Sequence, residues 1–343
     1  MKNRLLLLVF ACFVLAGCHS ESGEEQLPEG PVQSASGFAR GADISWVTQL
    51  EKEGYVFYNT SGQVRECTAL MKELGMDAIR LRVWVNPENG WCGKDDVLKK
   101  ARRAKALGMR LMIDFHYSDS WADPGKQTPP AAWAGANLME MQNLVKTHTA
   151  DVLRALKAEN IAVEWVQVGN ETSNGMLWPM GKCDTSPAAY AALHNTGYEA
   201  VKSVYPDAKV IVHLHNGDDA NLYNWLLGEL ERKGAKYDMI GMSLYPPQNW
   251  RIKSELTIAN MKSLYAKFGK RVMVCEVGMP WDNADGCYDF LKYMLAEAER
   301  GGCCDGLFYW EPEAPVGYSG GYTLGAFADG RPTRALDAFS ASK

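Results

Sequence analysis

The chain has 343 residues, of which 47% are hydrophobic and 22% charged, with a formal net charge of -5. This length and composition are typical of one large globular α/β domain or of two ordinary ones. The acidic balance argues against a nucleic-acid partner, which would require a basic face. Its 11 Trp and 15 Tyr exceed ordinary core needs, and they serve either loop packing or the stacking of sugar rings.

The first residues are typical of a targeting segment. Lys2 and Arg4 precede an apolar run over 5–14 that is too short to cross a membrane. The ending Leu-Ala-Gly-Cys at 15–18 resembles the lipobox of bacterial lipoproteins, which implies a signal peptide over 1–17 and lipidation of Cys18. The alternative is a plain signal peptide with an incidental cysteine. Residues 18–36 predict a flexible tether, so we expect an exported protein, anchored by lipid to a bacterial membrane, with the outer membrane or cell surface favoured.

From residue 37 onward, strand-like and helix-like segments alternate. Near-continuous apolar runs predict eight strands of a parallel sheet covered on both faces, at 38–45, 77–84, 110–116, 163–170, 209–213, 239–245, 271–276 and 306–310. Amphipathic stretches predict helices between them, at about 64–74, 94–107, 140–158, 188–204, 220–233, 255–268 and 284–299. Eight such units over 37–343 predict a single (β/α)8 TIM barrel. A doubly wound sheet is the competitor, but no Gly-x-Gly-x-x-Gly follows the first strand.

Two glutamates stand at the ends of apolar strands. By strand count, Glu171 ends the fourth strand and Glu276 the seventh, so both are expected at the catalytic rim of a barrel. By the period of two, Val272, Val274 and Glu276 are expected to share one face. A buried charge is costly unless it is used. A carboxyl pair at one rim favours glycoside hydrolysis, in which one carboxyl protonates the leaving oxygen while the other attacks the sugar or activates water.

The second strand carries two arginines toward the same rim. Arg80 and Arg82 share one face of this strand, and Trp84 follows on it. An arginine beside the nucleophilic carboxylate would keep it ionised. Because Arg82 lies nearer the rim, it is the one predicted to do so.

Further residues for sugar binding are predicted at other strand ends. His116 follows the third strand. It either hydrogen-bonds sugar hydroxyls or is a core histidine whose hydrogen bonds are made within the protein. Trp121 is expected to stack on a ring. Tyr245 ends the sixth strand and is expected to orient the nucleophile through its hydroxyl. Trp310 ends the eighth strand and is expected to form the floor under the reacting sugar.

Metal ligands are weakly represented in the sequence. His-x-His at 213–215 lacks partner histidines at neighbouring strand ends, and the loop 282–285 has oxygen ligands without the EF-hand pattern. We therefore predict no catalytic metal and no required cofactor, with a structural calcium left open. Of nine cysteines, Cys12 leaves with the signal and Cys18 takes lipid, so seven remain. An exported location permits disulfides, and the odd number leaves a free thiol, for which Cys275 is expected.

Several stretches together resemble glycoside hydrolase family 53, the endo-β-1,4-galactanases of the retaining barrel clan A. The Asn-Glu pair at 170–171 marks the clan broadly, whereas Ser-Asp-Ser-Trp-Ala-Asp-Pro at 118–124 and Leu-Trp-Pro at 177–179 are more specific to this family. The matching stretches span nearly the whole domain and are 41–45, 80–87, 118–124, 168–171 with 175–179, 243–246 and 309–312.

The resemblance implies a role for each matching residue. Glu171 becomes the acid/base, Glu276 the nucleophile, and Asn170 the holder of the sugar 2-hydroxyl; Asp43 and Asp119, within the same motifs, join the predicted substrate-binding set. The implied substrate is β-1,4-galactan or its oligosaccharides, cleaved by a monomer. Alternatives are a mannanase or cellulase of the same clan, or a glycan-binding lipoprotein without catalysis. The chain departs from the family at Val277, where Thr is frequent, and in the short loop after Glu276.

Overall fold

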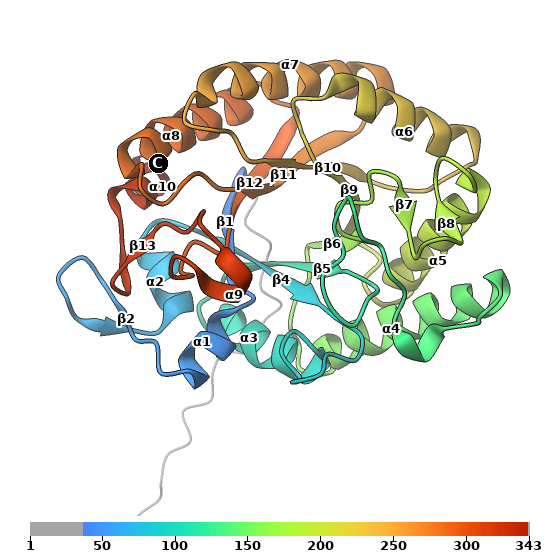
Figure 1. Ribbon diagram of the computed structural model, residues 1–343, viewed down its shortest axis with the longest axis horizontal. Coiled ribbons are helices and arrows are strands. Elements are labelled where there is room, and N and C mark those ends of the chain that lie inside the picture. Colours follow the sequence, from blue (N-terminus) through green and yellow to red (C-terminus); the bar gives the residue numbers. More distant parts are fainter. Residues whose placement is uncertain (1–36, 342–343) are drawn as a thin grey trace, which may run out of the picture. The chain divides into compact units, whose positions relative to one another are not determined.

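The computed structural model describes residues 37–341. Eight parallel strands close into a barrel in which β12 pairs with β1, so the predicted (β/α)8 barrel is confirmed (Figure 1). The barrel strands are β1 (Ala39–Asp43), β4 (Ala78–Val83), β5 (Arg110–Phe115), β6 (Trp165–Val168), β9 (Lys209–Leu214), β10 (Met239–Leu244), β11 (Arg271–Val277) and β12 (Cys304–Trp310). The predicted signal peptide, the tether and Cys18 lie outside the described residues.

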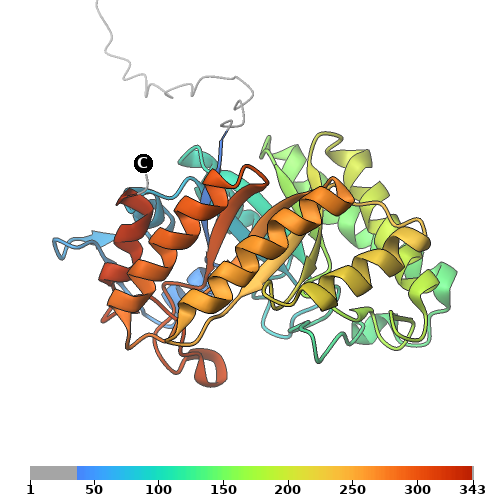
Figure 2. The ribbon, with the colours of Figure 1, turned by 90° about the horizontal axis from the view of Figure 1, so that it is seen from above.

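Helices surround the barrel in all seven intervals where the periodicity predicts them. They are α2 (Cys67–Glu73), α3 (Lys94–Ala106), α4 (Leu138–Ala158), α5 (Pro187–Val204), α6 (Ala220–Arg232), α7 (Trp250–Phe268) and α8 (Ala284–Arg300). Figure 2 shows α7 and α8 side by side against the outside of the strands. Helix α2 begins later than predicted because Val64 and Arg65 pair in a hairpin, and the Glu66 side chain then caps the helix at the Ala69 amide.

Short elements decorate the loops between these units. Three two-stranded hairpins and two short 3-10 helices accompany the small helices α1, α9 and α10. The small elements are α1 (Val47–Lys52), β2 (Phe57–Tyr58), β3 (Val64–Arg65), β7 (Gly175–Met176), β8 (Gly181–Lys182), α9 (Tyr318–Gly321), β13 (Phe327–Ala328), β14 (Arg331–Pro332), α10 (Asp337–Ala341) and the 3-10 turns Ala131–Trp133 and Arg334–Leu336.

Two apolar layers hold the barrel together. A large cluster fills the space between strands and helices, and a smaller one fills the barrel interior. The interior is tightly filled, since a Cβ on Gly41 would lie 2.3 Å from the Phe308 ring. This small cluster leaves the other end of the interior, toward the carboxyl ends of the strands, to polar side chains. Its members are Ala39, Ala78, Met112, Trp165, Ile211, Met239, Met273, Cys275 and Phe308.

The cysteines of the described segment form no disulfides. Each of the seven is buried and free, including Cys275, for which a free thiol was expected. The disulfides that an exported location would permit are therefore not formed. Within residues 37–341, no helix combines the length and apolarity needed to cross a bilayer.

Candidate active site

Glu171 is placed by a glycine turn at the end of β6. Gly169 adopts a φ of +92°, and a Cβ there would lie 2.5 Å from the Thr172 side chain, so only glycine fits. Glu171 itself has a φ of 44°, a backbone conformation unfavourable for a residue with a Cβ and frequent at functional sites. The turn places the partly exposed Glu171 at the carboxyl end of β6, at the barrel mouth.

Glu276 points into the barrel because a bulge in β11 interrupts the alternation of side chains between the barrel interior and the helices. Val272 and Val274 pack toward the helices, whereas Cys275 lies in the interior cluster. Against β10, the register passes from Val274 directly to Glu276, so Cys275 is an extra, bulged residue. The expectation that Val272, Val274 and Glu276 share one face is therefore wrong. The bulge turns Glu276, 5% exposed, into the barrel mouth.

The arginine beside Glu276 is Arg80, and the prediction that Arg82 would lie there is wrong. Arg80 Nη2 lies 2.8 Å from Glu276 Oε1. The reason is the length of the side chain, because the Arg80 backbone pairs with Met112 while its guanidinium reaches Asp114, two residues further along β5. Every polar nitrogen of this buried guanidinium has a partner. Besides Glu276, these are Asp43 at 2.6 Å, Gln167 at 2.6 Å, Asp114 at 2.9 Å and Asn170 at 3.0 Å.

Two donors favour the carboxylate form of Glu276 against the effect of burial. The Tyr245 hydroxyl donates to Glu276 Oε2 at 2.6 Å, in the orienting position predicted for it. Burial raises the pKa of Glu276, and the Arg80 guanidinium and the Tyr245 hydroxyl oppose that rise. Asp114, behind Arg80, has a pKa that burial would raise but that Arg80 and His116 lower to about 2. Glu276 thus sits in surroundings built for a negative charge.

Among residues 37–341, no cation lies at hydrogen-bond distance from the Glu171 carboxyl. Burial raises its pKa to about 8, and the charge of Glu276 raises it further in the same direction. A hydrogen bond from the Ser243 side chain and the more distant Arg80 oppose the rise. The raised pKa favours the protonated form of Glu171 at neutral pH.

Arg82 instead supports a cluster of tryptophans. Its Nη1 pairs with Glu311 at 2.8 Å, and its guanidinium lies 4.3 Å from the centre of the Trp121 ring and 5.1 Å from that of Trp84. Trp310 packs on Trp121 at 5.8 Å between ring centres. The three predicted tryptophans are partly exposed, so they form an aromatic wall at the mouth with Arg82 buried behind it.

The other residues predicted to bind substrate form hydrogen bonds or ion pairs with groups of the protein. His116 accepts from the Ala122 amide at Nδ1, and its Nε2 lies 3.0 Å from Asp114, as in the alternative of a satisfied core histidine. Asp43 bonds Arg80 and Ser45, and Asp119 accepts from the amides of Asn86 and Ala131. Asn170 Nδ2 donates to the Ala122 carbonyl. Direct contact of these residues with a sugar stays a prediction.

Sequence reasoning missed several residues of the site. Trp46 packs its ring 5.6 Å from Trp121 and 5.3 Å from Trp310, completing the aromatic wall. Gln167 and Ser243 contribute buried polar groups from β6 and β10, and His213 on β9, weighed above only as a metal ligand, lies between them. For these strand residues, the available signal was a single polar side chain within an otherwise apolar strand.

No metal site accompanies the carboxyl pair in the described segment. Within it, no group of three or more His, Cys, Asp and Glu is placed to hold a metal ion. In the loop considered for calcium, the Asn283 side chain caps α8 and Asp285 pairs with Arg334.

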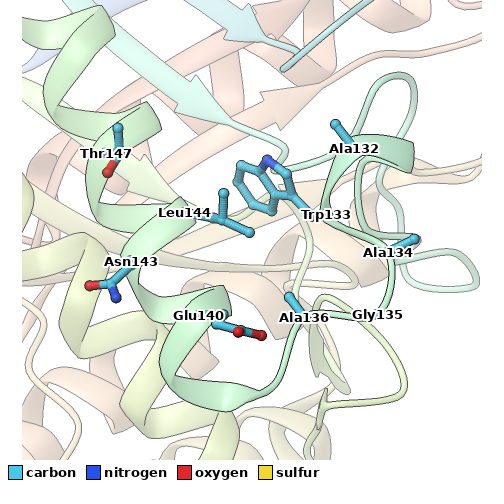
Figure 3. A pocket seen from close by; sticks show the side chains of 9 residues that line it. All are labelled: Ala132, Trp133, Ala134, Gly135, Ala136, Glu140, Asn143, Leu144 and Thr147. Carbon is cyan, nitrogen blue, oxygen red and sulfur yellow. The ribbon is translucent and has the colours of Figure 1, made fainter.

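Two hollows lie beside the mouth rather than at the carboxyl pair. One, of about 510 Å³, lies between the loop 132–136 and α4, with the Trp133 ring pointing toward Leu144 (Figure 3). The other, of about 690 Å³, is lined mainly by apolar residues of 128–136 and 177–180. Neither is lined by Glu171 or Glu276, so the chemistry is assigned from the strand ends.

A barrel that holds two unlike carboxyl groups at the carboxyl ends of its strands, beside a wall of aromatic rings, has the arrangement of a (β/α)8 glycoside hydrolase. The model of glycosyl hydrolase family 53 matches residues 39–299. The chain belongs to this family.

Named relatives agree with this assignment. A protein of Aspergillus terreus named as a probable arabinogalactan endo-beta-1,4-galactanase A is 34% identical over 83% of this chain and 88% of its own length. The endo-beta-1,4-galactanase of Bacillus subtilis is 31% identical over 82% of this chain and 71% of its own. A solved structure from a study of two fungal beta-1,4-galactanases has a TM-score of 0.80 at 29% identity, covering 88% of this chain and 98% of that one.

Proposed function

We propose that this protein is an endo-acting, retaining hydrolase of β-1,4-galactosidic bonds in galactan and type I arabinogalactan, the side chains of pectin. The observation that carries the proposal is the unequal pair of carboxyls, with Arg80 and Tyr245 on Glu276 and neither on Glu171. The names of the family relatives supply the substrate class. The aromatic wall offers stacking surfaces for the apolar faces of galactose rings.

The two carboxyls act in sequence. Glu171 donates its proton to the glycosidic oxygen while Glu276 attacks the anomeric carbon, which releases the leaving sugar and forms a glycosyl ester. The ester neutralises Glu276, and this removes one of the charges that raise the pKa of Glu171. Glu171, now a carboxylate, takes a proton from water as the water attacks the anomeric carbon, and Glu276 leaves with retention of configuration. These steps need no cofactor; a structural calcium in the loop 282–285 would act only on stability.

Product analysis tests the proposed substrate. The protein, with Glu276→Gln as the inactive control, is incubated with β-1,4-galactan, β-mannan and cellulose, and the products are separated by chromatography. We expect a ladder of galactooligosaccharides from galactan alone, each first released as the β-anomer by proton NMR. Release from mannan or cellulose at comparable rates would favour the related clan enzymes. Specific binding without release would favour a glycan-binding lipoprotein.

We also propose that the protein is an exported monomer anchored to a bacterial membrane through lipid on Cys18, with the outer membrane or cell surface favoured. The support is the lipobox-like ending Leu-Ala-Gly-Cys and the polar segment that follows it. Metabolic labelling with a palmitate analogue should mark the wild type and not Cys18→Ala. Labelling of both, or of neither, would contradict the anchor.

A further inference from the structure

The face of the barrel opposite to the mouth gathers positive charge. Because each helix runs back from the end of one strand to the start of the next, this amino-terminal face carries the last turns of the helices and the first residues of the strands. All seven helices from α2 to α8 have a lysine or an arginine in the last turn. The turns that follow these helices add further cations, namely Lys209, Lys233, Lys236, Lys270 and Arg271.

Hydrogen bonds between neighbouring units place several ammonium groups on this face. Lys105 on α3 donates to the carbonyl of Glu159, at the end of α4, at 2.8 Å. Lys157 on α4 donates to the carbonyl of Val204, at the end of α5, at 2.6 Å. Lys72 on α2 makes the same kind of bond to the end of α3. Because the carbonyl ends of the helices lie on the amino-terminal face, these ammonium groups lie there too.

The positive charges of this face exceed its negative ones. Most acidic residues of the same turns are neutralised by ion pairs, as for Glu73, Asp77, Glu159, Glu164, Asp238 and Glu299. Within residues 37–341, only Asp207 and Glu231 of these turns have no cation at ion-pair distance. By contrast, no carboxylate of the same segment lies at that distance from the three lysines just described or from Lys209, Lys233, Lys267 and Lys270. An excess of cations is therefore left, although the whole chain has a net charge of -5.

The chain enters the barrel on the same face. Gly37, the first described residue, lies at the start of β5, because the Arg110 guanidinium donates to its carbonyl at 3.1 Å. In Figure 2, β1 enters the barrel on one side, whereas the loop with α9, which follows β12, projects on the other. Residues 18–36 can extend over at most about 65 Å, so a lipid on Cys18 would hold the amino-terminal face within reach of the bilayer.

We propose that the amino-terminal face is a docking surface for the anionic headgroups of a lipid bilayer, on which the anchored enzyme rests with its mouth directed away. A lysine close to such a surface contributes roughly fivefold to binding. The acidic balance of the rest of the chain opposes this only weakly, because salt screens charges over about 8–10 Å. The seven residues of β12 place the mouth roughly 20 Å from the face. The position beside a bilayer rests on the proposed anchor, whereas the attraction of anionic lipid rests on the lysines alone.

Lysines at helix ends also stabilise the helices themselves. A cation in the last turn interacts favourably with the helix dipole, and this is a sufficient reason for the lysines within the helices. Lys209, Lys233 and Lys270 lie outside the helices, on three successive turns of the face. In the described segment, none of these three ammonium groups donates a hydrogen bond, and Lys270 alone contacts a ring, that of Tyr237 at 5.4 Å. Their replacement thus removes charge without removing a hydrogen bond or an ion pair.

The test measures binding to vesicles by sedimentation. Residues 18–343 with Cys18→Ala keep every described element and carry neither signal peptide nor lipid. This protein is compared with the face variant Lys209→Gln/Lys233→Gln/Lys270→Gln on vesicles of phosphatidylcholine alone and of phosphatidylcholine with phosphatidylglycerol. The matched control is Lys99→Gln/Lys146→Gln/Lys292→Gln, which removes the same charge from exposed positions in the middle of α3, α4 and α8. Melting temperatures confirm that each variant is folded.

We expect binding to the anionic vesicles to be about tenfold or more tighter than to phosphatidylcholine alone, and high salt should remove the difference. The face variant should lose about tenfold or more of its affinity for the anionic vesicles. The control variant should bind as the parent protein does.

The orientation is tested with a dye on one introduced cysteine, which is labelled selectively because the seven native cysteines of the described segment are buried. Asp207→Cys places the dye on the amino-terminal face, and Val316→Cys places it in the loop after β12, on the side of the mouth; both positions are exposed. A quencher attached to the lipid headgroups should quench the first dye and leave the second bright.

Equal binding to both kinds of vesicle, or an unchanged affinity in the folded face variant, would overturn the docking surface. Binding to soluble polygalacturonate without binding to vesicles would overturn it as well, because the face would then recognise an acidic polysaccharide. Equal quenching of the two dyes would contradict the outward mouth. These readouts need neither galactan cleavage nor lipid on the protein, so the proposed function or the anchor can fail while the docking surface stands.

Discussion

Glu276 and Glu171 stand at the same barrel mouth in opposite electrostatic surroundings. Glu276 has a guanidinium at 2.8 Å and a tyrosine hydroxyl at 2.6 Å. Glu171 has the hydroxyl of Ser243 and the unfavourable charge of Glu276. The backbone differs as well, since Glu276 lies within a bulged strand and Glu171 in a turn with positive φ.

This contrast shows how one residue type acquires two roles. In the proposed mechanism, the carboxylate that attacks has fixed donors that favour its ionised form, whereas the carboxyl that delivers a proton has no cation beside it among the described residues. The charge of Glu276 raises the pKa of Glu171, which favours a proton on Glu171 until the proposed ester neutralises Glu276. The predictions below test each half of this contrast.

Replacing the nucleophile should have the largest effect. Glu276→Gln keeps the shape but cannot form the glycosyl ester, so kcat on galactan should fall by about 10⁴-fold or more. Initial rates of reducing-sugar release measure this. Glu164→Gln is the matched control, because Glu164 pairs with Arg110 just before β6, at the opposite end of the strand from Glu171. Comparable rates for wild type and Glu276→Gln would remove Glu276 from the chemistry.

Replacing the acid/base should have an effect that depends on the leaving group. Glu171→Ala should lower kcat/KM on galactan by about 10²–10⁴-fold, the usual contribution of general acid catalysis. An aryl galactooligosaccharide with an acidic phenol needs no protonation, so its first step should remain fast and a phenol burst should appear. Added azide should then restore turnover as a β-galactosyl azide. An equal loss on both substrates would assign Glu171 a role other than proton transfer.

Substitutions of the two arginines of β4 test which of them acts on Glu276. Arg80→Lys keeps a charge but loses most of the contacts to Glu276 and its neighbours, so kcat/KM should fall by about 10²-fold. The acidic limb should move to higher pH, because Glu276 loses a group that lowers its pKa. Arg82→Lys leaves the Glu276 contacts intact, and its effect should be about tenfold or less. Larger losses from Arg82→Lys would reverse the assignment, with melting temperatures showing whether either variant is misfolded.

Features that depend on a short stretch of the chain can be predicted from the sequence, whereas features that depend on contacts between distant strands cannot. The barrel and both glutamates are predictable, because apolar runs mark the strands and a charge at a strand end stands out. The choice between Arg80 and Arg82 is not, because it depends on how far a long side chain reaches across the barrel. The inward orientation of Glu276 depends on a β-bulge. Strict alternation along the strand would predict that Glu276 faces the helices. Gln167 and Ser243 are connected only through His213, which contacts both from a third strand, and no stretch of sequence shows that arrangement.

The dependence of stability on pH provides the smallest and most direct test of the contrast. Burial raises the pKa of Glu171 from 4.5 to about 8, so the native state binds more protons than the unfolded state between these values. The contribution of Glu171 to stability is therefore present below pH 4.5 and is lost as pH rises toward 8. Glu171→Gln mimics the protonated form, and it should gain roughly 3–4 kcal/mol over wild type between pH 5 and 8 in urea unfolding. Glu276→Gln should gain less, because Arg80 and Tyr245 oppose the rise in the Glu276 pKa and the substitution leaves Arg80 without this partner. A constant difference between wild type and Glu171→Gln across this range would mean that Glu171 is already ionised in the resting enzyme, and the proton for the leaving oxygen would then have to come from another group.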